Sequence, residues 1–264
     1  IGQLLLHQCS PAQREEHLFA IVNHLNRGQA LLQMATERQE LAQLNLQAGR
    51  KAKAATAYRT AVDYLHQGIR LLPADAWERE YDLTLALHQD ITEATYLCTD
   101  FEQMEQWAAI AIRQARSLLD TVPIYEARLL AGRAQGNYLA AVRTGLEVLQ
   151  ALGVDFPEQP IVTEVQQSLA TTYRLWCDHS PLNLLDLPRM EDPQRLAAMQ
   201  IMTKLTAPTY RALPDLMPLL MTKQVEFSIC FGNSPISIFS YAGYGMALCS
   251  MGNIDAGYDF GQLS

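Results

Sequence analysis

The chain has 264 residues, of which 49% are hydrophobic and 18% are charged. This composition is typical of a folded protein with a sizeable core, and it excludes disordered and collagen-like chains. A net charge of −8 argues against nucleic acid as the partner, because such binding normally requires a basic surface. No apolar run reaches the ~18 residues of a membrane-spanning helix, so we expect no membrane insertion.

Cysteine use and the two ends of the chain indicate its cellular setting. The five cysteines are odd in number, widely spaced and without a C-x-x-C pair. This pattern predicts reduced thiols in a cytoplasmic protein and no zinc framework. The start lacks the basic flank of a signal peptide. Because there is no initiator Met and the end interrupts an apolar-periodic stretch, we expect a segment of a longer protein.

Helical signals begin close to the first residues. Ser10, Pro11 and Gln13 have the spacing of an N-cap, a proline at the first helical position and a capping-box partner. Apolar residues then recur at helical spacing until Gly28, which predicts the end of this helix. These apolar residues are Leu18, Ile21, Val22 and Leu25.

Apolar residues keep a helical period along the rest of the chain. The segments concerned are 37–72, 78–98, 101–119, 124–135, 138–152, 161–177, 193–206, 215–230 and 235–250. We find no alternating strand pattern with a hairpin turn. The sequence therefore predicts an all-α fold.

Four segments repeat one pattern, in which a small or polar turn precedes an aromatic residue or an isoleucine. The leading residues are Tyr58, Phe101, Tyr138 and Ile254; three places on lie Ala61, Met104, Ala141 and Gly257; four further on lie Leu65, Ala108, Gly145 and Gly261. Such a repeat is typical of paired helices that stack and bury the face that one pair alone leaves open.

This pattern resembles the tetratricopeptide repeat, a helix–turn–helix unit of ~34 residues. In the best copy, the family's small, alanine, bulky, second small and proline positions fall on Gly49, Ala61, Leu65, Gly68 and Pro73. The family's leading tryptophan and leucine are replaced by Asn45 and Ala48. The resemblance implies an α-solenoid, an array of stacked helical hairpins.

Gly49 invites a second interpretation, because Arg50, Lys51 and Lys53 follow it. A phosphate-binding loop needs a second glycine before its lysine and a strand before the loop, and the sequence has neither. We therefore expect Gly49 to allow two helices of one repeat to approach each other closely.

Two proline-containing breaks, at 155–160 and 179–193, interrupt the regular pattern. We predict leading helices over 1–36 that join an upstream module, and tetratricopeptide-like repeats over 37–154. Further repeats with proline-containing insertions are expected over 155–264.

A longer resemblance covers nearly the whole chain. The stretches "IVNHLN", "LAQLNLQAGRKAKAATAY" and "AWEREYDL" are similar to the helical segment of large bacterial, notably cyanobacterial, hybrid signalling proteins. Those proteins combine a serine/threonine kinase, a P-loop ATPase, helical repeats, a GAF sensor and often a histidine kinase. The resemblance implies a non-catalytic scaffold between these modules, because the kinase and Walker motifs are absent from this chain.

Few residues suggest chemistry of their own. His17 and His24 lie two turns apart, but no carboxylate or thiol completes a metal site with them. Cys177, Asp178 and His179 are adjacent on the chain, and adjacent helical residues point in different directions. We therefore expect no catalytic residue, no cofactor and no metal.

The family's concave groove is lined by fixed positions of each first helix. In the best copy these positions are Gln43, Leu46, Arg50, Lys53 and Ala54. Arg50 and Lys53 could face an acidic peptide there, or they could belong to a solvated helix face. The expected partners are a protein or peptide and neighbouring domains of the same polypeptide. A small-molecule effector domain and, further behind, a helical enzyme are the alternatives.

The second half of the chain is rich in methionine: Met190, Met199, Met202, Met217 and Met221. Methionine fills irregular cores, and it also forms adaptable partner surfaces. We expect these residues to belong to the core.

Overall fold

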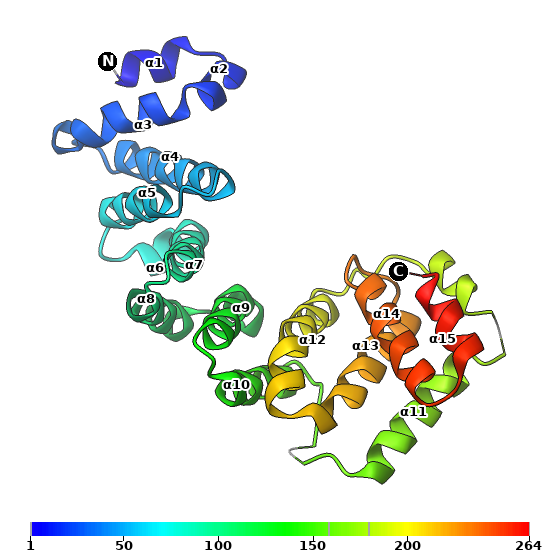
Figure 1. The fold of residues 1–264 in the computed structure, drawn as a ribbon. Helices are drawn as coiled ribbons and strands as arrows, with labels where there is room; N and C mark the ends of the chain where they lie inside the picture. Colours follow the sequence, from blue (N-terminus) through cyan, green and yellow to red (C-terminus); the bar gives the residue numbers. More distant parts are fainter. Residues whose placement is uncertain (1, 158, 179, 264) are drawn as a thin grey trace. The chain divides into compact units, whose positions relative to one another are not determined.

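The computed structural model describes residues 2–157, 159–178 and 180–263, without the side chain of His7, and Figure 1 shows that its elements are helices. The predicted all-α class is confirmed. Within the described residues, β-type pairing is limited to one isolated bridge between Arg189 and Asn233. Among the same residues, no helix is both long and apolar enough to cross a membrane.

The chain forms two compact units, Ile1–Ala127 and Arg128–Ser264. The helices that begin in the first unit are α1 (Gly2–Gln8), α2 (Pro11–Glu16), α3 (Leu18–Arg27), η1 (Gln29–Leu31), α4 (Ala35–Ala54), α5 (Tyr58–Leu71), α6 (Ala76–Arg79), α7 (Tyr81–Leu97), α8 (Phe101–Gln114) and α9 (Leu118–Ala134). The others are α10 (Tyr138–Ala151), α11 (Val162–Trp176), η2 (Pro181–Asp186), α12 (Pro193–Ala212), η3 (Pro214–Leu216), α13 (Met217–Phe231), α14 (Ser237–Ser250) and α15 (Ile254–Gly261).

The predicted cap of the first amphipathic segment is present. The Ser10 backbone N–H donates to Oε1 of Gln13 at 2.9 Å, and the Gln13 backbone N–H donates to Oγ of Ser10 at 3.4 Å. The structure has two helices where the sequence predicts one, because α2 ends and α3 begins at His17. Helix α2 buries no side chain, whereas α3 buries four apolar residues and ends at Gly28 as predicted.

The same turn closes the hairpins α4–α5, α7–α8, α9–α10 and α14–α15. The N–H of the residue before the second helix donates to the carbonyl five residues earlier: Ala57 to Ala52, Asp100 to Thr95, Asn137 to Gly132 and Asn253 to Leu248, at 2.8–3.0 Å. One residue before each donor the backbone is left-handed, with φ of 59° at Thr56, 60° at Thr99, 74° at Gly136 and 87° at Gly252. This is the Schellman motif, which satisfies carbonyls that the helix end leaves unpaired.

The second helices of these hairpins begin at Tyr58, Phe101, Tyr138 and Ile254. These are the four leading residues of the repeat pattern in the sequence. The residues three places further on are buried in each case: Ala61, Met104, Ala141 and Gly257. The last position of the pattern is less uniform, because Gly261 is exposed.

Close approach of the two helices explains the glycine at Gly49. A Cβ atom there would lie 2.6 Å from Cγ of Leu65 and 3.4 Å from the carbonyl oxygen of Ala61. The expected packing role of Gly49 is therefore confirmed. Helix α14 has its counterpart in Gly245, where a Cβ would lie 2.8 Å from the carbonyl oxygen of Gly257.

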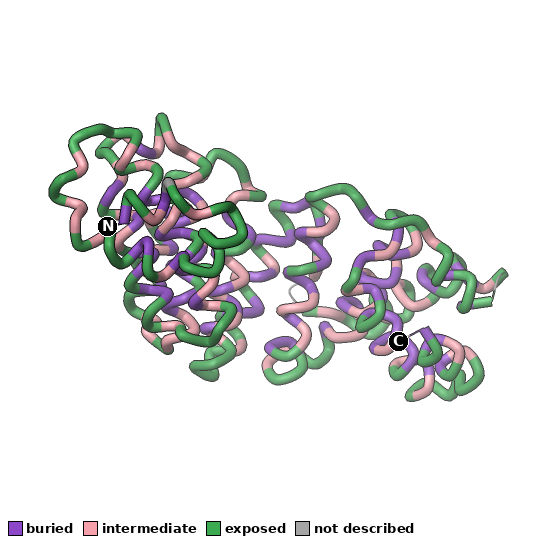
Figure 2. Tube along the Cα trace, turned by 90° about the horizontal axis from the view of Figure 1, so that it is seen from above, coloured by how far each residue is buried: buried purple, intermediate pink, exposed green. Residues whose placement is uncertain are grey.

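Helix α7 covers the α4–α5 hairpin in the first unit, and its Leu87 and Ile91 are fully buried. Gly68 of α5 permits this contact, since a Cβ there would lie 2.7 Å from Cδ2 of Leu87. At the position of the family's tryptophan, Asn45 is fully buried and exchanges two 2.9 Å hydrogen bonds with Asn26. Figure 2 shows how buried residues recur between exposed ones along the helices.

The second unit packs α12 against α10 and α13 against α11 and α14. Met190, Met199 and Met202 are buried, so the expected core role is confirmed for these three methionines, while Met217 and Met221 are half-buried. A core of Trp176, Tyr241, Tyr244 and Phe260 joins α11 to α14 and α15. Burial raises the pKa of Tyr241 to about 12, and its hydroxyl donates to Asn233 at 2.7 Å.

The helix crossing in the α4–α5 hairpin can be tested with Gly49→Val. The added side chain must displace Leu65, so we expect the free energy of unfolding to fall by about 1–3 kcal/mol. The control is Gln47→Val, which introduces the same side chain at an exposed position of the same helix and is expected to cost about 0.5 kcal/mol or less. Urea denaturation followed by circular dichroism measures both; equal costs would contradict the packing role of Gly49.

The shared turn predicts a stabilising substitution. Thr56 holds a left-handed conformation that L-residues other than glycine adopt at a cost of ~1 kcal/mol or more, and glycine occupies the same position at Gly136 and Gly252. We therefore expect Thr56→Gly to raise the free energy of unfolding by about 0.5–1 kcal/mol. Thr60→Gly, inside α5, is the control and should lower it by about 0.3–0.5 kcal/mol. A loss of stability in Thr56→Gly would show that this turn has other requirements.

Candidate partner-binding groove

The structure brings two of the five predicted groove positions together, and Ala54 is exposed outside the pocket that they line. Gln43 and Arg50 line an open pocket of ≈ 750 Å³, which α4 shares with α1, α2 and α3. Leu46 is not in this pocket, because it is 8% exposed and packs in the core with α7. Lys53 lies one turn further along α4 and points towards α7.

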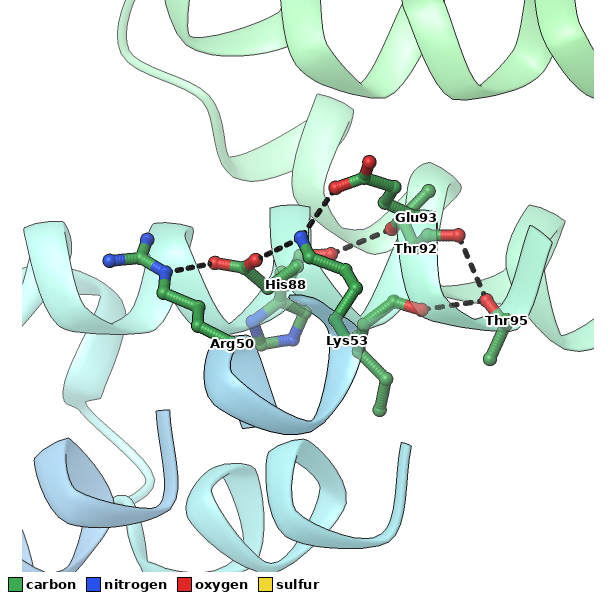
Figure 3. A network of polar contacts seen from close by, with 8 residues as sticks. Arg50, Lys53, His88, Thr92, Glu93 and Thr95 are labelled. Carbon is green, nitrogen blue, oxygen red and sulfur yellow. Dashed lines mark hydrogen bonds and ion pairs between the residues drawn. The ribbon is translucent and has the colours of Figure 1, made fainter. Parts of the chain in front are cut away.

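The basic residues of α4 are paired with acidic residues of α7 (Figure 3). Nε of Arg50 lies 2.7 Å from Oδ2 of Asp90. Nζ of Lys53 lies 2.6 Å from Oδ1 of Asp90 and 2.5 Å from Oε2 of Glu93. Asp90 is thus bound by two cations, and the cluster joins the first helix of one hairpin to the first helix of the next.

Burial and pairing act in opposite directions on Lys53. Burial works to lower its pKa, but the hydrogen bonds to Asp90 and Glu93 outweigh this and raise the pKa above its ordinary value. Lys53 therefore keeps its charge, and that charge is already neutralised within the chain. Its side chain is only 20% exposed, which leaves little of it for a partner.

Arg50 differs from Lys53 in its availability. Its side chain is 55% exposed, and among the described residues it makes no hydrogen bond other than that of Nε to Asp90. The two terminal guanidinium nitrogens can therefore donate to a ligand in the pocket, in an orientation fixed by Asp90. A planar guanidinium held in this way suits a carboxylate.

The pocket also has counter-charges and hydrogen-bonding groups. Arg14 and Lys51 add positive charge to its lining, and Glu15 and Glu40 add negative charge. Lys51 is partly engaged, since its Nζ donates to the backbone carbonyl of Glu15 and lies 5.6 Å from the ring centre of Phe19. Arg14 is engaged through Nε, which donates to the carbonyl oxygen of Cys9 at 3.0 Å, so Arg14 and Arg50 both have terminal guanidinium nitrogens available at this pocket, and Arg50 alone of the two is oriented by an ion pair.

A buried histidine lies beside the charged cluster on α7. The ring centre of His88 is 4.8 Å from that of Trp77 and 5.7 Å from that of Trp107. Its Nδ1 lies 2.7 Å from the carbonyl oxygen of Thr84, to which it donates a hydrogen bond in the neutral ring. Burial lowers the pKa of His88, only partly opposed by this hydrogen bond, so the imidazole is neutral in the folded state. The ring is a packing element between α6, α7 and α8.

A second pocket, of ≈ 560 Å³, lies in the second unit between α10 and the segment around Phe156. Its walls combine apolar side chains with Arg143, Glu147 and Asp155. Such a mixture of apolar walls and a few charged groups is common among small-molecule sites.

The other residues that suggested chemistry do not assemble a site. His17 and His24 are exposed. Sγ of Cys177 lies 3.9 Å from Oδ1 of Asp178, and His179 lies outside the described residues. No cluster of three His, Cys, Asp or Glu suitable for a metal ion occurs within the described part of the chain.

Comparisons with protein-family models, curated proteins and solved structures gave no match for the chain. The geometry defines its class as an all-α protein of recurring helical hairpins.

The partners of Arg50 and Lys53 could not be found by motif, because they lie 40 and 37 residues away on another helix. The repeat register is the signal that could have found these partners, because it places α7, the first helix of the next hairpin, beside α4.

His88 makes folding sensitive to acid. Because its pKa is lowered from 6.5, the unfolded chain binds a proton at pH values where the folded chain does not. Its contribution to stability is therefore complete above about pH 6.5 and is lost as the pH falls below that value.

We expect the unfolding free energy to fall between about pH 7 and 5, and to fall less steeply in His88→Gln. His66→Gln is the control, since His66 is exposed on α5. Urea denaturation across this pH range gives both slopes. Identical slopes for the wild type and His88→Gln would contradict a buried neutral imidazole.

Proposed function

We propose that the chain is a non-catalytic helical-repeat scaffold of the tetratricopeptide type within a multidomain signal-transduction kinase. Its role is to mediate protein–protein or interdomain contacts between ATPase or kinase modules and sensor modules. The observation that carries the proposal is the recurrence of one turn and one pattern of buried positions in four hairpins. An array of such units offers extended surfaces for partners, as solenoid proteins do.

The proposed partner surface is the pocket on α4, with Arg50 as its main anchor and Gln43 as a neighbouring polar contact. An acidic peptide is the partner chemistry that suits an exposed guanidinium already oriented by Asp90. Lys53 and Leu46 do not contact the partner in this proposal. Lys53 holds α4 against α7 through its ion pair with Asp90, and Leu46 does so by packing in the apolar core.

A second function is a small-molecule effector domain, and the pocket beside α10 is the observation that favours it. A ligand at 100 times its dissociation constant would stabilise the fold by about 2.7 kcal/mol. A thermal-shift screen that found such a ligand, with the shift lost in Leu213→Arg, would favour this function over the scaffold.

The partner pocket can be tested with two labelled peptides. One is an acidic peptide that contains Glu, and the other has the same sequence with each Glu replaced by Gln. We expect the chain to bind the acidic peptide more tightly, and Arg50→Gln to weaken that binding about tenfold, because a charge-assisted hydrogen bond contributes roughly 1.5–3 kcal/mol. Arg38→Gln, an exposed change on the same helix outside the pocket, should leave binding unchanged. Fluorescence anisotropy measures these affinities.

Equal binding of both peptides, or equal loss in both variants, would rule out the Arg50 anchor.

The kinase context has its own test in the coding sequence on both sides of this segment. Kinase and ATPase motifs upstream, with GAF or histidine kinase motifs downstream, are the expected result. Flanking sequence without any signalling module would contradict this part of the proposal.

A further inference from the structure

A pocket of ≈ 420 Å³ in the second unit lies between the turn at 153–155, Arg195 of α12 and residues 223–231 of α13, and we call it the Arg195 pocket. Its apolar lining includes Val154, Phe227 and Phe231. Sites for small molecules have volumes of about 300–1,000 Å³. The Arg195 pocket is therefore large enough for a small ligand.

The guanidinium of Arg195 lies over two aromatic rings. Its Cζ is 4.5 Å from the ring centre of Phe231 and 5.4 Å from that of Phe227. The two rings are inclined at 78° to each other, with 5.2 Å between their centres. Such stacking fixes the plane of a guanidinium and leaves the N–H groups at its edge free to donate.

Arg195 lacks the partners that a half-buried cation normally has. Within the described residues its side chain makes neither an ion pair nor a hydrogen bond, and the other arginines there with neither are exposed. Its backbone N–H donates to the N-cap residue Asp192, so Arg195 lies in the first turn of α12. The helix dipole opposes a positive charge at this end. Neither an internal partner nor helix stability accounts for this cation.

The other charges of the Arg195 pocket limit what can bind there. Nζ of Lys223 is neutralised by Glu226, whose Oε2 lies at 2.7 Å. Oε1 of Glu226 accepts a hydrogen bond from Thr172 at 3.0 Å. Asp155 adds an exposed carboxylate to the lining. The pocket thus presents one unpaired cation beside apolar walls, with acidic groups close enough to disfavour a dianion.

We infer that the Arg195 pocket binds a small organic monocarboxylate with an apolar body. The carboxylate accepts hydrogen bonds from the edge of the Arg195 guanidinium, an arrangement that the planar group favours. The apolar body lies against Phe227 and Phe231. A phosphate fits less well, because Asp155 and Glu226 repel its second negative charge.

This site goes beyond the proposed scaffold role and does not depend on it. It shares only Asp155 with the pocket beside α10, and it shares no residue with the pocket on α4. Loss of acidic-peptide binding at Arg50 would therefore leave this inference intact, and the reverse also holds.

The probes are phenylacetate and phenylacetamide, which have nearly the same shape and differ in charge. NMR titration of the whole chain measures their dissociation constants for the wild type, Arg195→Gln and Arg143→Gln. Arg143→Gln is the matched control, because it removes an exposed arginine from the pocket beside α10. Circular dichroism checks that each variant is folded.

We expect the wild type to bind phenylacetate at least about tenfold more tightly than phenylacetamide. Arg195→Gln should weaken phenylacetate binding about tenfold and remove the preference, and Arg143→Gln should change neither. Absence of binding, equal affinity of the wild type for both probes, or a loss in Arg143→Gln and not in Arg195→Gln would overturn the inference.

Cys230 gives a readout that needs no variant. It is exposed and lines the Arg195 pocket, and partial burial together with the charge of Glu226 raises the pKa of its thiol. At alkaline pH, saturating phenylacetate should slow its alkylation by iodoacetamide, while alkylation of Cys98 in the first unit stays unchanged. Mass spectrometry of the digested protein measures both rates, and an unchanged rate at Cys230 would place the ligand elsewhere and overturn the inference.

A carboxylate beside an apolar group also occurs at the end of a protein chain. The same titration with an acetylated tripeptide that ends in phenylalanine tests this source. An affinity at least about tenfold higher than that of phenylacetate would assign the pocket to a protein C-terminus and overturn the small ligand. We expect no such gain.

Discussion

The close approach of the two antiparallel helices in the hairpins α4–α5 and α14–α15 is the constraint on which the other features depend. At Gly49 and Gly245 the second helix lies so near that a Cβ atom would overlap it. The left-handed turn residue and its hydrogen bond fix the point where the chain reverses, and so they fix which residues meet at the crossing. Once turn and crossing are set, the register of every other position in the hairpin follows.

That register determines where the charged groups lie. Arg50 and Lys53 follow directly after the crossing glycine, on the side of α4 that faces α7. Their pairing with Asp90 and Glu93 adds an electrostatic contact between successive hairpins to the apolar one. It also leaves one guanidinium exposed at the pocket with its orientation already fixed. A lysine at this position would carry all its donors on the one nitrogen that binds Asp90. Arg50 binds Asp90 through Nε and keeps the donors of its two terminal nitrogens.

Much of this arrangement could be predicted from the sequence, because the signals are local. Helical periodicity gave the all-α class, and the repeat pattern gave the first residues of α5, α8, α10 and α15. The division of α2 from α3 was missed, since Glu15, Glu16 and His17 do not break a helix by propensity. The burial of Leu46 was missed as well, because a groove position in the family need not face solvent where α7 packs against it.

The pairing of Arg50 with Asp90 and the placement of His88 between two tryptophans depend on contacts between distant segments. A single sequence gives no direct information on such contacts. The register offered an indirect route, because Asp90 lies on the first helix of the hairpin that follows.

The most direct test of recurring hairpins is amide hydrogen exchange at the four turn donors, Ala57, Asp100, Asn137 and Asn253, measured by NMR. Three of these residues, Ala57, Asn137 and Asn253, are exposed, and each of the four closes its hairpin through a backbone hydrogen bond. We expect all four amides to exchange far more slowly than in an unstructured peptide, because exchange requires the hairpin to open. Exchange at the unprotected rate at these sites would contradict the shared turn and the register derived from it.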